Sequence, residues 1–244
     1  MQKTTIAWTN YSWNPTSGCD KVSPGCKHCY ADDIATRFAG SKAFPNGFKF
    51  TIHRDRFDQP RKVHKPSKIF VNSMSDLFHE QMQLATIQKL FAVMGECPQH
   101  TFQILTKRHE RLAELAPSLI WHPNIWMGVS VENQRYADLR IPYLRSVTAA
   151  VRFLSVEPLI EPVQLNLEGI HQVLIGCESG PKRRPMNPDW ARSVRDQCGE
   201  AGTTFFMKQL EIRGKVTEEL SDFPADLRIR QWPKTGTVQG ELFV

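Results

Sequence analysis

The sequence predicts an α/β fold built on a parallel sheet, and three observations support this prediction. The chain has 244 residues, a length at which an α/β barrel commonly forms one domain. Apolar residues make up 41% of it, enough for a sizeable core. From residue 68 onward, short apolar runs repeatedly end in small polar clusters and are mostly followed by helix-like stretches. Buried strands that alternate with helices form βα units and a parallel sheet.

About seven strands are expected. The first is the segment 4–13, which is rich in Thr, Ile, Trp and Tyr and leads into a loop. The others are the apolar runs 69–71, 102–105, 125–129, 151–154, 173–176 and 204–207. The segment 48–57 is expected to form an extended arm or a hairpin.

Helices are expected after most of these strands. A short one is predicted at 31–38, and apolar residues at helical spacing follow the strands that end at 71, 105 and 129. The helix after residue 154 is missing or very short. The clearest helix precedes the last strand: Asn187 can cap it, Pro188 suits its first turn, and Gly199 and Gly202 end it.

Three of the six cysteines, Cys19, Cys26 and Cys29, lie in one segment rich in Gly and Pro, which is typical of a loop. Thiolates that converge on one point bind a soft metal. A structural zinc site usually has four protein ligands, and His28 is an awkward fourth because it lies between two of the cysteines. A cubane iron–sulfur cluster with three cysteines leaves one iron open for a small molecule. These residues are compatible with either zinc or a cluster, and a purely structural, redox-inert set of thiols is a third alternative.

Composition limits the possible locations and partners. The sequence has no apolar run of about 18 residues and no signal-peptide core, so we expect a cytoplasmic protein without a membrane span. Clustered cysteines then indicate a metal rather than disulfides, while Cys97, Cys177 and Cys198 are expected to be small buried residues. The net charge of +6 favours an anionic partner such as nucleic acid.

Each predicted strand after the first ends in polar residues. These ends carry Asn72, Ser73 and Asp76; Lys107 and Arg108; Ser130, Glu132 and Asn133; Glu157; Glu178; and Lys208. The carboxyl ends of the strands form the active face of a parallel β/α barrel. A simple helix cap is an alternative role for Asp76. Capping does not explain Glu157, which precedes Pro158, or Glu178. We expect most of these side chains to line one polar cavity.

The run Cys26-Lys27-His28-Cys29-Tyr30 resembles the cluster loop of radical S-adenosylmethionine (SAM) enzymes, although the cysteines here are separated by six and two residues instead of three and two. Together with Trp13-Asn14-Pro15, the segment 71–78 and the other strand ends, this loop is similar to an uncharacterised bacterial and phage protein family related to radical-SAM proteins. The similarity covers about residues 5–210. It implies a partial parallel β/α barrel, a radical-SAM-like derivative of the TIM barrel, over residues 1–210. Residues 211–244 would be a C-terminal extension packed on the same domain.

The resemblance also implies roles. Cys19, Cys26 and Cys29 would hold a [4Fe–4S] cluster whose open iron binds SAM, so that an external electron donor drives release of a 5′-deoxyadenosyl radical. The cofactor-binding candidates are Asn72, Ser73 and Asp76 for the methionyl amine, Lys107 or Arg108 for its carboxylate, and Glu132 and Asn133, with Ser130 beside them, for the ribose. The catalytic candidates, which face the substrate or a proton transfer, are Glu157, Glu178 and Lys208.

A nucleic acid or nucleotide is the expected substrate. Two basic groups are expected near the open face: the residues Arg61, Lys62, His64, Lys65 and Lys68, and the run Lys182-Arg183-Arg184. The first group is either a solvated surface or a contact for a phosphate backbone. Two other functions remain open. One is a zinc-binding barrel that acts as a hydrolase or a nucleic-acid-binding module, and the other is a phage-derived interaction protein without catalysis.

Overall fold

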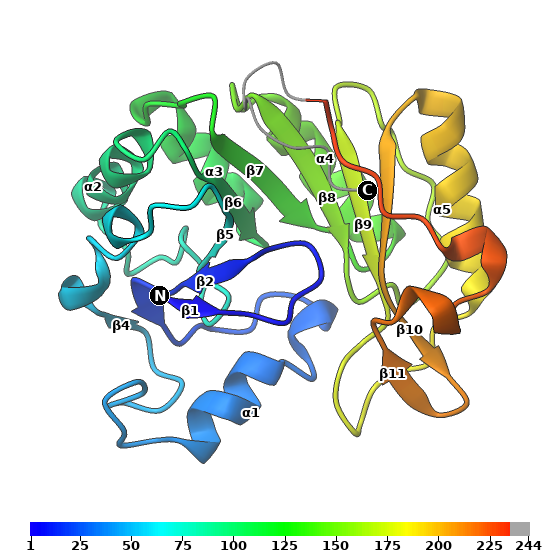
Figure 1. Cartoon of the computed structure of the whole chain (residues 1–244), viewed down its shortest axis with the longest axis horizontal. Helices are drawn as coiled ribbons and strands as arrows, with labels where there is room; N and C mark the ends of the chain where they lie inside the picture. Colours follow the sequence, from blue (N-terminus) through cyan, green and yellow to red (C-terminus); the bar gives the residue numbers. More distant parts are fainter. Residues whose placement is uncertain (235–244) are drawn as a thin grey trace.

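The computed structural model describes residues 1–234, and its centre is one nine-stranded, mostly parallel sheet (Figure 1). Seven parallel strands lie side by side in chain order: β2 (Tyr11–Trp13), β5 (Lys68–Val71), β6 (Thr101–Thr106), β7 (Ile125–Ser130), β8 (Val151–Val156), β9 (Gln172–Gly176) and β10 (Thr204–Ile212). The short strands β1 (Gln2–Lys3) and β11 (Lys215–Thr217) pair antiparallel at the two edges. The predicted parallel α/β sheet is confirmed. Because β1 and β11 are its two edges, the described residues form no closed barrel.

The first predicted strand is shorter than expected. Only Tyr11–Trp13 joins the parallel sheet, and residues 4–10 turn back so that the Thr4 amide donates to the Asn10 carbonyl at 3.2 Å. The apolar residue Trp8 is buried against the sheet instead, with its ring 4.6 Å from that of Phe70. Its aromatic character therefore reflects burial rather than a strand.

Helices α2 (Leu84–Gly95), α3 (His109–Leu115), α4 (Gln134–Arg145) and α5 (Pro188–Ala201) wrap around the outside of the sheet, while α1 (Tyr30–Arg37) lies apart (Figure 1). The predicted caps of α5 are confirmed: Asn187 accepts from the Asp189 amide at 2.9 Å, and Gly202 ends the helix at a φ of +66°. The expectation that Gly199 also ends the helix is wrong, because Gly199 lies within α5. No helix lies between β8 and β9, as expected. Within residues 1–234, every helix is too short or too polar to cross a membrane.

The shorter elements complete the described chain. Strand β3 (Thr16–Ser17) pairs with β4 (Thr51–Ile52), so part of the predicted extended arm forms a small second sheet. The 3₁₀ helices are η1 (Pro24–Cys26), η2 (Arg54–Arg56), η3 (Pro60–Lys62), η4 (Ala116–Ser118), η5 (Leu220–Asp222) and η6 (Ala225–Leu227).

Strand side chains alternate between two cores, because successive residues of a strand point to opposite faces. Residues such as Ile69 and Val71 pack under the helices, whereas Phe70 lies in a second, largely aromatic cluster with Trp126 and Phe206 on the other face. Apolar side chains thus fill this second face along the strands. The polar candidates lie at or beyond the carboxyl ends of the same strands, so the candidate site lies at that end of the sheet.

The C-terminal region extends the same sheet. Strand β10 runs past the predicted boundary at residue 210 to Ile212, and its Leu210 pairs with Thr217 of β11. Farther on, the Met207 amide donates to the Ile229 carbonyl at 2.8 Å, and the Trp232 ring packs on this region. Of the predicted extension 211–244, residues 235–244 lie outside the described part of the chain.

Candidate functional site

The three cysteines of the loop lie at the carboxyl-end side of the sheet, and each is half-buried with a free thiol. Cys26 ends η1, and Cys29 directly precedes α1. Burial, together with the negative charge of Asp76, raises the pKa of Cys19 to about 12, although Arg108 opposes this shift. Among residues 1–234, no three His, Cys, Asp or Glu side chains are grouped in the way that one metal ion requires.

Hydrogen bonds attach this loop to the ends of two strands. The Gly25 amide donates to Glu132 Oε1 at 3.3 Å, and Glu132 follows β7. The Tyr30 hydroxyl donates to the backbone oxygen of Ser73 at 2.7 Å, and Ser73 follows β5. The loop therefore crosses the edge at which the parallel strands end, and α1 continues along that side (Figure 1).

The residues after β5 combine an unpaired donor with a fully bound carboxylate. Asn72 has a φ of +63° and is buried; its Oδ1 accepts from the Thr16 amide at 3.4 Å, while its Nδ2 has no partner among the described residues. Asp76 accepts from Thr106 Oγ1 at 2.7 Å and from the Lys107 amide at 3.1 Å. Asp76 thus ties the end of β5 to the end of β6.

The two cations after β6 lie beside different site candidates. The Lys107 ammonium donates to Ser130 Oγ at 2.9 Å, which joins the ends of β6 and β7. Arg108 donates to Glu80 Oε1 at 2.8 Å and to the backbone oxygen of Asp20 at 3.4 Å. Lys107 therefore lies among the strand-end candidates, whereas Arg108 lies beside the candidate ligand Cys19.

A fully buried ion pair follows β7. Glu132 Oε2 accepts from Arg140 Nη1 at 2.7 Å, with the two side chains 0% and 1% exposed. The next residue, Asn133, accepts from the Tyr136 amide at 3.2 Å and so caps α4. Both side chains have structural partners, and their expected contact with a ribose stays a prediction.

The end of β8 meets β10 through an ion pair. Lys208 Nζ donates to Glu157 Oε2 at 2.6 Å, and Ser155 Oγ donates to Glu157 Oε1 at 3.2 Å. Burial lowers the pKa of Lys208, but the charge and hydrogen bond of Glu157 outweigh burial and raise it. Burial raises the pKa of the nearby Glu218 carboxyl, although Lys208 opposes the shift. Lys208 is therefore a protonated side chain that lies between the carboxyl groups of Glu157 and Glu218.

The end of β9 carries a second carboxylate–guanidinium pair. Glu178 Oε2 accepts from the Arg184 amide at 2.8 Å and from its Nε at 2.9 Å, while Nη2 of the same side chain binds Oε1. Although burial acts in the opposite direction, the hydrogen bonds from Arg184 hold the pKa of Glu178 below its usual value. Arg184 Nη2 also donates to the backbone oxygen of Pro24 at 2.9 Å, so this pair touches the cysteine loop.

The two basic groups lie at opposite ends of the strands, one at the carboxyl ends and one at the amino ends. The run Lys182-Arg183-Arg184 follows β9 and lies at the carboxyl ends as expected. Lys68 instead begins β5, so the residues 61–68 lead into the amino end of the sheet, and Arg61 pairs there with Glu96. The expectation that residues 61–68 lie near the open face is wrong. Lys68 is the first residue of β5, so the length of that strand separates it from the carboxyl end at Val71.

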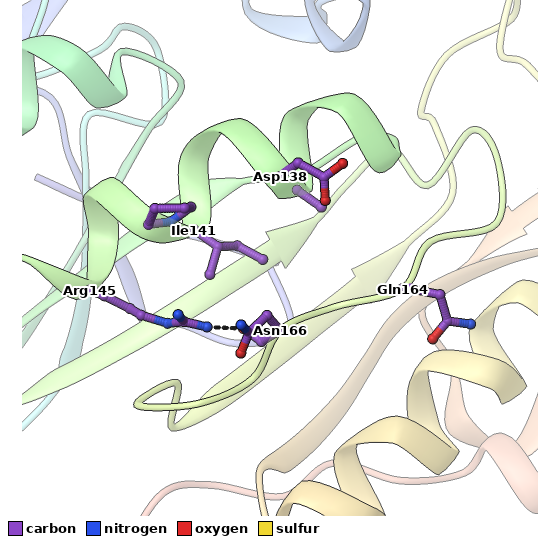
Figure 2. Close-up of a pocket in the computed structure, with 7 residues that line it drawn as sticks. Asp138, Ile141, Arg145, Gln164 and Asn166 are labelled. Carbon is purple, nitrogen blue, oxygen red and sulfur yellow. Dashed lines mark hydrogen bonds between the residues drawn. The ribbon is translucent and has the colours of Figure 1, made fainter.

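A pocket of about 190 Å³ lies away from these residues, between α4 and the segment after β8 (Figure 2). Asp138, Ile141 and Arg145 of α4 line it, and Arg145 Nη2 donates to the backbone oxygen of Asn166 at 3.0 Å. None of the predicted site residues lines this pocket.

The sequence analysis missed Arg140, although the sequence contains a signal for it. Arg140 lies at helical spacing between Ala137, Ile141 and Leu144, all of which are buried. A charged residue on the apolar stripe of a helix needs a buried partner. That partner, Glu132, is eight residues away in the sequence.

The types of donor at this edge, three thiols and a buried amide, suit an iron–sulfur cluster with a polar ligand beside it, although the three thiols are not grouped as a single metal ion would require. Thiolates are the ligands that such clusters use, and three free thiols come from one loop. The buried Nδ2 of Asn72 needs an acceptor that the described protein atoms do not provide.

The fold is similar to that of solved structures of spore photoproduct lyase. One, complexed with dinucleoside spore photoproduct, gives a TM-score of 0.52 at 13% identity over 82% of this chain and 63% of the lyase chain. A mutant with bound AdoMet and dinucleoside spore photoproduct gives 0.51 at 13% identity with the same coverage, and a further mutant gives 0.52 at 16%. This chain therefore spans about 63% of the length of those lyase chains. No curated protein was found that matches its sequence.

A family model matches almost all of the described chain. The match covers residues 3–228, from β1 to beyond η6, and so includes the sheet, the cysteine loop and every strand end that carries a candidate residue. The chain belongs to the family described as "Protein of unknown function (DUF5131)".

Proposed function

We propose that this protein is a radical-SAM enzyme in which Cys19, Cys26 and Cys29 hold a [4Fe–4S] cluster. The observation that carries the proposal is the loop with three free thiols across the carboxyl ends of a parallel sheet. The likeness to the lyase structure with bound AdoMet supports it. The proposal includes a sheet curved into a partial β/α barrel, as in radical-SAM enzymes.

A cluster with an open iron, when bound, supplies the electron that reduces the sulfonium of SAM. The surrounding residues bind and orient the cofactor. The Lys107 ammonium is the proposed partner of its carboxylate, and Asn72 Nδ2, which has no partner within residues 1–234, would donate to one of its oxygens. Ser73 and Asn133 complete this set at the ends of β5 and β7, while Asp76 holds Lys107 in place through the backbone.

Glu157 and Lys208 are the proposed acid–base pair on the substrate side. Lys208 holds its proton at Nζ, 2.6 Å from Glu157 Oε2, so Lys208 is the proposed proton donor to the substrate and Glu157 the proposed acceptor. Proton transfer by positioned side chains of this kind is general acid–base catalysis. Glu178 is the least available of the three proposed catalytic residues, because Arg184 binds both of its oxygens.

The proposed substrate is a nucleotide or nucleic acid. The support comes from the dinucleoside bound to the similar lyase structure and from the cations that follow β9. Lys182 is exposed at that edge and is suited to a phosphate, whereas Arg183 is paired with Glu211.

Anaerobic reconstitution with iron and sulfide tests the proposal. We expect about four iron atoms per chain, the visible absorption of a cluster, and loss of both in Cys26→Ala but not in the matched control Cys97→Ala. With dithionite and SAM, the reconstituted protein should release 5′-deoxyadenosine. One zinc and no iron uptake would refute the cluster, and a full cluster that leaves SAM intact would refute the radical-SAM reaction.

A further inference from the structure

The turn that carries Cys26 is bound on one side by a buried ion pair. The Gly25 amide donates to Glu132 Oε1 at 3.3 Å, and Arg140 binds the other oxygen of the same carboxylate at 2.7 Å. The approach is so close that a Cβ on Gly25 would lie 3.1 Å from Glu132 Cδ and 3.3 Å from Lys107 Cε. Only glycine lets the turn approach this carboxylate without a shift.

A second pair binds the turn from the end of β9. Arg184 Nη2 donates to the backbone oxygen of Pro24 at 2.9 Å, while the same guanidinium and the Arg184 amide bind Glu178. A guanidinium can do both because its five N–H donors point in fixed directions. Glu178 is 4% exposed, so a buried carboxylate holds Arg184 in place.

We propose that these two pairs, Glu132–Arg140 and Glu178–Arg184, are positioning residues that fix Cys26 over the strand ends. Each pair contacts only backbone atoms of the turn, on opposite sides of one peptide unit: the carbonyl of Pro24 and the amide of Gly25. They therefore set where the turn lies without touching the thiol. Their value for cluster assembly rests on the proposed function, but the fixed position of the turn does not.

Alkylation of Cys26 in the metal-free protein measures this position directly. Iodoacetamide labelling is followed peptide by peptide from pH 7 to 10, and thiolate rate constants are compared, so that a change in thiol pKa does not enter. Loss of a charge-assisted hydrogen bond in Arg184→Gln should speed Cys26 labelling about tenfold. Gly25→Ala should act in the same direction, and Arg184→Lys should recover part of the protection.

The matched control is Arg183→Gln. Arg183 is the neighbouring residue and is similarly half-buried, but it binds Glu211 instead of the turn, so labelling of Cys26 should not change. The buried Cys198 reports on the fold as a whole. An equal rise at Cys198 would mean general loosening and would overturn the local role.

The proposal is overturned if Arg184→Gln and Gly25→Ala both label Cys26 at the wild-type rate. Iron uptake separates it from the proposed function. If the wild-type chain takes up no iron but both variants still expose Cys26, the positioning role stands and the cluster enzyme does not. If all variants take up iron equally and labelling is unchanged, the cluster stands and the positioning role does not.

Discussion

Replacing Glu132 by Gln should destabilise the fold strongly, because it leaves the Arg140 charge buried without a counter-charge. The two side chains are 0% and 1% exposed, and their closest atoms are 2.7 Å apart. Removing one partner of such a pair costs about 3–5 kcal/mol. For a chain of this length, that loss corresponds to a fall in Tm of about 6–20 °C.

Thermal unfolding followed by circular dichroism measures the effect. Glu168→Gln is a matched control, because Glu168 pairs with Arg145 at 3.9 Å on the surface, and such exposed pairs contribute about 0–1 kcal/mol. The double variant Glu132→Gln, Arg140→Met should recover most of the loss, since an apolar side chain of similar volume tolerates burial. If Glu132→Gln lowers Tm no more than Glu168→Gln does, the pair is not the buried contact described.

Three further outcomes are expected. Burial lowers the pKa of His100 from 6.5, so the folded state binds fewer protons than the unfolded state. The free energy of unfolding, measured by urea denaturation, should therefore fall as the pH drops below 6.5, and it should fall less steeply in His100→Gln. Gly128→Ala would place a Cβ 2.4 Å from the Phe153 ring and should lower the free energy of unfolding by about 1–3 kcal/mol, and an unchanged urea midpoint would contradict this packing. Chelator treatment of the reconstituted protein should release its iron without unfolding β5 to β10, because none of these strands includes a cluster cysteine. A collapse of the far-UV circular dichroism signal would show instead that the sheet depends on the metal.

The parallel sheet was predictable because its strands are local apolar runs, and each of the seven lies where a run was found. The exception is the segment 4–10, which has the residue types of a strand but packs Trp8 on the sheet instead. Strand propensity measures how well a side chain fits a half-buried surface, and Trp8 meets that condition without being in a strand.

The position of the candidate residues was predictable, but their partners were not. Parallel strands bring their carboxyl ends to one edge, so a residue that follows a strand can be placed from the sequence alone. Whether that residue stays available depends on contacts between distant elements. Asp76, for example, is bound by the end of β6, and Arg184 reaches a turn 160 residues before it.

The strand-end carboxylates divide by the kind of partner that they bind, and this division separates the scaffold from the chemistry. Asp76 and Glu132 each accept a backbone N–H from another segment, so their oxygens fix the chain path. Glu157 accepts instead from two side-chain donors, Ser155 and Lys208, so neither of its oxygens holds a backbone segment in place. A change in the partners of Glu157 therefore alters a side-chain contact, whereas a change at Asp76 or Glu132 removes a contact with the backbone. The pair Glu157–Lys208 therefore suits proton transfer, while Asp76 and Glu132 suit a rigid frame for the cysteine loop.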